Sequence, residues 1–181
     1  MAAVSATPLD PVEEQVAIVT ESGEVVGSAP RSQMRRENLP HLVVAILVRD
    51  PLGRVYVQRR TDTKDVFPGA HDCWVAGCVT AGEDPSDAAI RELSEELGIT
   101  GAPLTPLFQQ WYADEWTRHV ALTWTVTWSG PVMHQPEEVA WGAWLTLGEL
   151  DSRLADPAWP FVPDGRALYD TWRQSREPRR S

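Results

Sequence analysis

The chain has 181 residues, a hydrophobic fraction of 43% and a formal net charge of −10. This length suits one domain with a sizeable core. Such an acidic chain lacks the basic surface with which proteins bind a nucleic acid polymer, and no stretch approaches the ~20 apolar residues of a membrane helix. We therefore expect a small-molecule partner, and neither a nucleic acid polymer nor a membrane.

Two features of the sequence predict a cytoplasmic location. Residues 1–11 contain neither a basic segment nor a long apolar run, so they do not resemble a signal peptide. The two cysteines, Cys73 and Cys78, are too few for a disulfide framework and predict reduced thiols. The expected organisation is a frayed or disordered N-terminus at 1–14, a single domain at 15–175 and a tail at 176–181.

In chain order, short runs rich in β-branched and aromatic residues predict strands, and longer amphipathic stretches predict helices. The predicted strands cover 16–19, 24–26, 42–48, 54–60, 74–79, 107–112, 120–128 and 140–145. The predicted helices cover 30–37, 85–97, 147–154 and 164–173. This order indicates a mixed α+β or α/β sandwich.

The helix at 85–97 has the clearest signals. Asp84 can cap its first turn, Pro85 suits the first helical position, and Gly98 can end the helix in a left-handed conformation. One face of the helix is apolar and is expected to pack on a sheet. This face comprises Ala89, Leu93 and Leu97, with Ile90 beside them.

A second face of this helix is acidic. Glu92, Glu95 and Glu96 stand at positions i, i+3 and i+4, which lie on the same side of a helix. Adjacent carboxylates repel one another unless a hard divalent cation, which prefers oxygen ligands, lies among them. The alternative is a solvated acidic face, although Arg91 is the only base within the helix sequence.

The surrounding sequence resembles the Nudix box, Gly-x5-Glu-x7-Arg-Glu-U-x-Glu-Glu-x-Gly-U, where U is a bulky aliphatic residue. The matching residues are Gly77, Glu83, Arg91, Glu92, Leu93, Glu95, Glu96, Gly98 and Ile99. A chance match at every fixed position occurs on the order of once in 10⁹ starting positions. The resemblance extends over residues 15–175 and implies a Nudix α/β/α sandwich with a central mixed sheet and a loop–helix–loop catalytic motif.

The resemblance also implies roles for the matched residues. The implied catalytic set is Arg91, Glu92, Glu95 and Glu96. Its three glutamates are the implied ligands of Mg²⁺ or Mn²⁺, Glu92 or Glu96 also accepts a proton from the attacking water, and Arg91 orients the carboxylates. Gly77 is expected to offer its carbonyl to a metal, and Glu83 to brace the loop or bind a second metal.

The segment before the box resembles isopentenyl-diphosphate isomerase and its hydrolase relatives, through residues 57–60, Lys64 and residues 67–69. In the isomerase, the matching Arg and Lys hold the diphosphate, which implies substrate binding by Arg60 and Lys64; the alternative is that both solvate a loop. The isomerase activity itself is disfavoured. Ala76 stands at the position of its catalytic cysteine, and Cys78 at that of its metal-binding histidine.

Other polar candidates lie outside the box. Asp114 and Glu115 fall in a loop where many Nudix enzymes supply another metal-binding or catalytic carboxylate, and two solvated loop acids are the alternative. Glu138 belongs to a stretch that resembles a common Nudix tail pattern, and it is expected to reach the site. The histidines show no ligand spacing and are expected to be non-catalytic. They are His41, His71, His119 and His134.

Three tryptophans, Trp74, Trp111 and Trp116, can each be read as stacking on a nucleobase or as part of the core. Taken together, the sequence predicts a divalent-metal-dependent pyrophosphohydrolase that acts on a nucleoside diphosphate derivative or a nucleotide. The alternatives are a nucleotide-binding sensor without turnover, and the disfavoured isomerase. Homodimers are frequent in the family, so a homodimer is one expected assembly.

Overall fold

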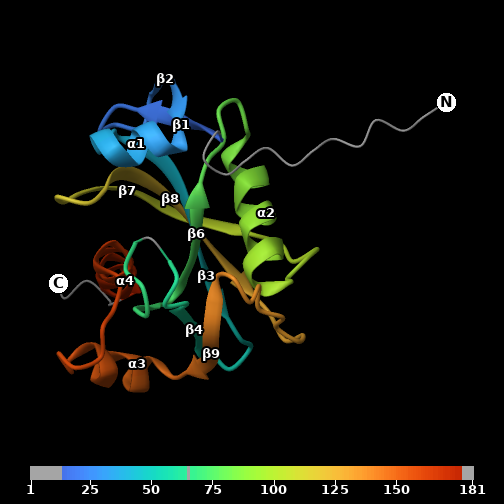
Figure 1. The fold of residues 1–181 in the computed structure, drawn as a ribbon. Coiled ribbons are helices and arrows are strands. Elements are labelled where there is room, and N and C mark those ends of the chain that lie inside the picture. The colour runs from blue at the N-terminus through green and yellow to red at the C-terminus, as the bar shows by residue number, and fades with distance from the viewer. Residues whose placement is uncertain (1–13, 65, 177–181) are drawn as a thin grey trace, which may run out of the picture.

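A computed structural model describes residues 14–64 and 66–176, and shows a mixed sheet with helices on both faces (Figure 1). The strands are β1 (Gln15–Val19), β2 (Val25–Pro30), β3 (His41–Arg49), β4 (Val55–Arg60), β5 (His71–Asp72), β6 (Trp74–Cys78), β7 (Thr105–Ala113), β8 (Arg118–Thr127) and β9 (Val139–Leu145). The helices are α1 (Arg31–Glu37), α2 (Pro85–Leu97), α3 (Leu147–Leu154) and α4 (Pro163–Arg176).

The elements predicted from the sequence are all present, with ends shifted by a few residues, and the fold class is confirmed. The short strand β5 was not predicted, because two residues carry no periodic signal. The expectations for the two chain ends concern residues 1–13 and 177–181, which lie outside the described residues.

Strand β3 is the centre of the sheet. It runs parallel to β8, with His41 beside His119, and antiparallel to β6, with Val44 beside Gly77. Its two ends contact β1 and β4. Because helices and loops cover both faces of β3, its sequence is an unbroken apolar run rather than an alternating one.

Two apolar cores lie on opposite faces of this sheet. Helix α2 covers the first core, which includes Val44, Ile46 and Val120. Helices α3 and α4 cover the second core, around Trp74 and Leu47. Figure 1 shows α2 on one side of β6 and α4 on the other.

The inward face of α2 differs from the predicted one. Ile90 is 51% exposed, whereas Ala88 and Glu96 are buried together with the expected Ala89 and Leu93. At 100° per residue, the buried arc is therefore centred near Glu96 and Ala89. This rotation leaves Ile90 at the edge of the arc and turns part of the acidic face toward the sheet, so the prediction for Ile90 was wrong.

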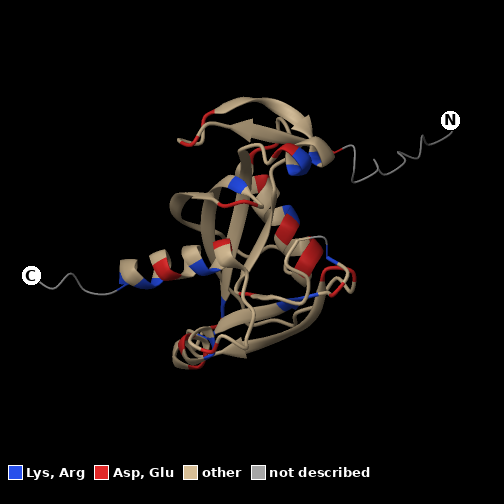
Figure 2. Ribbon diagram, turned by 60° about the vertical axis from the view of Figure 1, so that its left-hand side comes forward, with Lys and Arg blue, Asp and Glu red and all other residues tan. Residues whose placement is uncertain are grey.

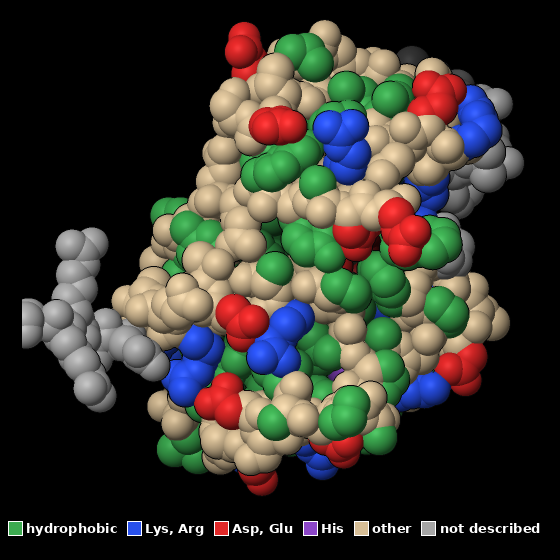
Figure 3. All heavy atoms as spheres, turned by 90° about the vertical axis from the view of Figure 1, so that its left-hand side faces the viewer, with side chains coloured by type: hydrophobic (Ala, Val, Ile, Leu, Met, Phe, Trp, Pro, Cys, Tyr) green, Lys and Arg blue, Asp and Glu red, His purple; other side chains and the backbone are tan. Residues whose placement is uncertain are grey.

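The surface of the protein carries charges of both signs. Acidic residues recur along α2 in Figure 2. The face seen in Figure 3, which includes α4, shows apolar patches between scattered acidic and basic groups. No helix in the described part of the chain has the length and apolar character needed to cross a membrane.

Candidate active site

The loop between β6 and α2 is held by its own hydrogen bonds. The Thr80 amide donates to Oε2 of Glu83 at 3.0 Å, and the Glu83 amide donates to the Thr80 carbonyl at 3.0 Å. Asp84 then caps α2 by accepting a hydrogen bond from the Ser86 amide at 2.8 Å. The helix ends at Gly98, whose φ of 65° is left-handed. These contacts fix where α2 begins and ends, and therefore how its glutamates face the sheet.

Gly77 allows Glu92 to lie against the backbone of β6. A Cβ atom added at Gly77 would lie 2.1 Å from the carboxylate carbon of Glu92, which is shorter than any tolerable contact. The glycine of the box is therefore required here for close approach rather than for an unusual φ. The Glu92 carboxylate is consequently held between α2 and β6.

Arg91 joins the loop and the helix through a set of hydrogen bonds. Its guanidinium binds both carboxylate oxygens of Glu83, at 2.9 and 3.1 Å, and donates to Glu92 at 2.7 Å and to Glu95 at 3.3 Å. A weaker contact reaches the Cys78 carbonyl at 3.4 Å. The hydrogen bonds from Arg91 lower the pKa of Glu83, so this carboxylate stays charged.

The three helical glutamates have different surroundings. Glu96 is 7% exposed and accepts a hydrogen bond from the Gln58 side chain at 2.9 Å. Burial, followed by the nearby charge of Glu92, raises the pKa of Glu96 to about 7. Burial also raises the pKa of Glu92. Glu95 points outward and is the most exposed of the three.

This donor set fits a hard divalent cation. Glu96 is buried and Glu92 is 14% exposed. Lost hydration raises the pKa of both, with a further rise from Glu95 for Glu92 and from Glu92 for Glu96, and a bound cation would relieve both effects. Within residues 14–64 and 66–176, however, no three His, Cys, Asp or Glu side chains converge into a ready-made metal site. In this structure Arg91 engages Glu83, Glu92 and Glu95, and Gln58 donates a hydrogen bond to Glu96.

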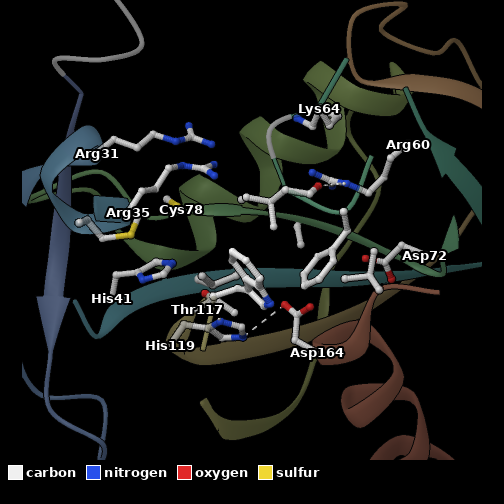
Figure 4. Close-up of a pocket in the computed structure, with 18 residues that line it drawn as sticks. Arg31, Arg35, His41, Arg60, Lys64, Asp72, Cys78, Thr117, His119 and Asp164 are labelled. Carbon is white, nitrogen blue, oxygen red and sulfur yellow. Dashed lines mark hydrogen bonds and ion pairs between the residues drawn. The ribbon is translucent and has the colours of Figure 1, made fainter. Parts of the chain in front are cut away.

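A solvent-open pocket adjoins these carboxylates. Ala76, Gly77 and Cys78 of β6 form part of its wall. Basic side chains line it from two elements: Arg31 and Arg35 come from α1, and Arg60 and Lys64 come from the end of β4 and the loop that follows. The remaining polar lining is His41, Asp72, Thr117, His119 and Asp164 (Figure 4).

The basic side chains are close enough to the glutamates to affect their charge. Lys64 and Arg60 lower the pKa of Glu96 and so partly offset its burial, and Arg31 does the same for Glu92. Arg60 donates from Nε to the Val66 carbonyl at 3.1 Å, and Lys64 forms an ion pair with Glu138. The acidic helix and the basic pocket therefore interact electrostatically and belong to one site.

Comparisons with known proteins agree with this geometry. The family profile of the NUDIX domain matches residues 39–165. The chain belongs to the Nudix hydrolases. It is 45% identical to the Nudix hydrolase orf19 of Rhodococcus erythropolis over 88% of this chain and 92% of the relative. It is 38% identical to the Nudix hydrolase YfcD of Escherichia coli, over 88% of this chain and 86% of the relative.

Solved structures show the same fold. DR0079 from Deinococcus radiodurans aligns with a TM-score of 0.74 and 26% identity over 91% of this chain and 100% of that protein. The NUDIX domain of NrtR from Shewanella oneidensis, solved with ADP ribose, aligns with a TM-score of 0.60 and 17% identity over 74% of this chain and 86% of that one. The predicted family and fold are confirmed, and this Nudix hydrolase is a pyrophosphohydrolase.

The predicted residues outside the box are placed differently by the structure. Arg60 and Lys64 line the pocket, whereas Asp114 and Glu115 do not. Asp114 instead organises its own turn, accepting hydrogen bonds from the amides of Trp116 and Thr117, both at 2.7 Å.

Several residues that line the pocket of this Nudix hydrolase were not predicted from the sequence. These are Arg31, Arg35, Asp72 and Asp164. Isolated charges on short elements carry no spacing signal, so only the fold brings them together. His41 and His119 were expected to be non-catalytic, and both lie in the pocket wall.

The three candidate tryptophans separate clearly. Trp74 is fully buried in one core, and Trp111 packs against the other. Trp116 is 66% exposed and lines the pocket. Cys78 is buried, and burial raises the pKa of its thiol, which makes the thiol a poor nucleophile.

Proposed function

We propose that this Nudix hydrolase cleaves the diphosphate linkage of a nucleoside diphosphate derivative or a nucleotide, and that it requires Mg²⁺ or Mn²⁺. The observation that carries the proposal is the position of Gly77. This residue contacts the Glu92 carboxylate and also lines the basic pocket. A diphosphate held by the pocket cations therefore lies next to the helical carboxylates.

Glu92, Glu95 and Glu96 are the proposed metal ligands, with the carbonyl of Gly77 as a further oxygen donor and Glu83 as a ligand for a second metal. These residues would hold the cation, which when bound would supply Lewis-acid chemistry that makes the attacking water more acidic. Glu92 and Glu96 suit this role because Glu96 is buried, Glu92 is only 14% exposed, and lost hydration raises the pKa of both carboxylates.

The protein side chains do the remaining work. Arg60 and Lys64 offset the negative charge of the diphosphate and hold it in place. Glu96 accepts the proton of the attacking water, while Gln58 fixes the orientation of its carboxylate. Arg91 orients the carboxylates of Glu92 and Glu83 by donating hydrogen bonds to both. Water attacks one phosphorus in line, and the other phosphate leaves.

The test is a panel of nucleoside diphosphates, triphosphates, diphosphate conjugates and isopentenyl diphosphate, with product release followed by mass spectrometry. We expect cleavage of at least one compound with Mg²⁺ or Mn²⁺, and none with EDTA. Tight binding of one compound without cleavage would instead indicate a sensor. Isomerised but uncleaved isopentenyl diphosphate would mean that Ala76 and Cys78 do not exclude the isomerase reaction.

A further inference from the structure

The pocket carries two pairs of basic side chains, which come from different parts of the chain. Arg31 and Arg35 belong to α1, whereas Arg60 and Lys64 belong to the end of β4 and the loop after it. Figure 4 shows the two pairs reaching into the pocket from opposite sides, with Cys78 of β6 beside the α1 pair. The proposed function assigns the diphosphate to Arg60 and Lys64, and it leaves the α1 pair without a role.

The two arginines of α1 make one end of the pocket strongly positive. Arg31 and Arg35 share a face of the helix because they stand four residues apart. Like charges at this spacing repel each other and destabilise a helix slightly, and a bound anion relieves that repulsion. Burial, together with the charges of Arg35 and Arg31, lowers the pKa of His41 to about 4. His41 is therefore neutral, and both arginines direct their charge into the pocket.

Arg31 is held in place by an ion pair that leaves it able to bind a ligand. Its Nη1 donates to Oε2 of Glu14 at 3.0 Å, and the Thr80 hydroxyl donates to Oε1 of Glu14 at 3.1 Å. The side chains of Arg31 and Glu14 are 32% and 27% exposed, so water only partly screens the pair. A guanidinium has five N–H donors, so the contact with Glu14 orients Arg31 without using up its hydrogen-bonding capacity.

The two basic pairs lie in different surroundings. Burial raises the pKa of Asp72 and of Asp164, and the charge of Arg60 partly offsets both shifts. Arg35 acts on His41 instead. The pocket has a volume of about 840 Å³, which suits a complete ligand rather than one diphosphate group alone. Two separate anionic groups of one ligand can therefore occupy the two ends together.

We propose that Arg31 and Arg35 form a second anion subsite, which binds a phosphate group of the substrate other than the two phosphates of the cleaved linkage. This inference deepens the proposed function and rests on it. Arginine suits the role because its planar guanidinium can form two parallel hydrogen bonds to phosphate oxygens. The substrate class is then a diphosphate compound that carries at least one further phosphate.

The alternative is that all four basic side chains surround the same diphosphate. Removal of either α1 arginine would then weaken the binding of every diphosphate compound. With a separate subsite, only ligands that have a third phosphate lose affinity. Linear inorganic phosphates distinguish the two arrangements directly, because they differ in the number of phosphate groups and contain no organic group.

The experiment measures the binding of inorganic diphosphate, triphosphate and tetraphosphate to the full chain by calorimetry in EDTA, which prevents metal-dependent cleavage. We expect triphosphate or tetraphosphate to bind at least about tenfold more tightly than diphosphate, as hydrogen bonds to charged groups allow. Arg31→Gln and Arg35→Gln should each remove most of this gain and leave the diphosphate affinity unchanged. Arg60→Gln should weaken the binding of all three phosphates.

Arg36→Gln is the matched control, because Arg36 lies on the same helix, has a side chain that is 67% exposed and does not line the pocket. It should leave all three affinities unchanged. Circular dichroism checks the fold of each variant, and Arg35→Gln decides the outcome if the loss of the Glu14 contact unfolds Arg31→Gln.

Equal binding of the three phosphates would overturn the subsite, and so would an equal loss of diphosphate and triphosphate affinity in Arg35→Gln. Metal-dependent cleavage of the substrate panel is measured separately on the native protein. Failure of the subsite therefore leaves the proposed hydrolase standing, whereas absence of cleavage counts against the hydrolase itself.

Discussion

At the scale of single residues, the absent side chain of Gly77 decides how closely α2 can approach β6. The Glu92 carboxylate occupies the space that a Cβ atom would take. Arg91 also donates a hydrogen bond to Glu92 and links it to Glu83 in the preceding loop. The position of this carboxylate therefore depends on one glycine and one guanidinium.

Gly77→Ala should reduce turnover at least about tenfold, because small misplacements of catalytic groups are costly. The new methyl group must displace Glu92, while the core beneath β6 is untouched. Steady-state kinetics with circular dichroism will measure both effects. Gly148→Ala is the matched control, since a Cβ atom there meets no other atom within 4 Å. Full activity in folded Gly77→Ala would show that the close approach has no catalytic importance.

His119 gives a prediction about stability and pH. Burial lowers its pKa from 6.5 to about 3, so the unfolded chain takes up this proton at a pH where the folded protein does not. The stability contributed by neutral His119 is complete above pH 6.5 and is lost as the pH falls below it. The cost near pH 5.5 is about 1.4 kcal/mol.

Urea unfolding of the native protein and of His119→Asn at pH 7.5 and 5.5 measures this cost. His41 and Asp164 titrate in both proteins, so the difference between the proteins isolates His119. We expect the stability advantage of the native protein over the variant to shrink by about 1.4 kcal/mol at the lower pH. A difference that is independent of pH would mean that His119 is not buried as a neutral side chain.

At the scale of elements, helix α2 was predictable because its signals are local. The Asp84 cap, Pro85 and the terminal Gly98 lie at the ends of an apolar repeat. In the structure the helix begins and ends at these residues, as predicted. What the sequence could not supply was the rotation of the helix on the sheet. That rotation buries Glu96 and exposes Ile90, and it depends on the side chains of β3 and β6 opposite.

Asp84→Ala should lower the free energy of unfolding by about 1 kcal/mol, the usual effect of removing an N-cap. The substitution leaves the Ser86 amide without its acceptor. Urea denaturation at neutral pH will show this as a lower midpoint with an unchanged slope. An unchanged midpoint would indicate that packing on β6, rather than the cap, determines where the helix begins.

At the scale of the whole molecule, the residues of the Nudix box could be predicted from the sequence, whereas most residues of the pocket could not. The box residues lie within one short segment, so spacing alone revealed them. The pocket joins α1, β3, the loop after β4, β8 and the start of α4, which are far apart in the chain. Arg60 and Lys64 were found through family resemblance, whereas Arg31 and Asp164 required the fold.

The central claim is that the carboxylates of α2, beside the basic pocket, catalyse metal-dependent diphosphate hydrolysis. The most direct measurement is the turnover of Glu96→Gln with the best substrate and Mg²⁺, compared with Asp87→Asn, which alters an exposed acid on the same helix. We expect Glu96→Gln to lose at least ~10²-fold in turnover while remaining folded, and Asp87→Asn to retain native activity. Near-native turnover in a folded Glu96→Gln protein would contradict the claim.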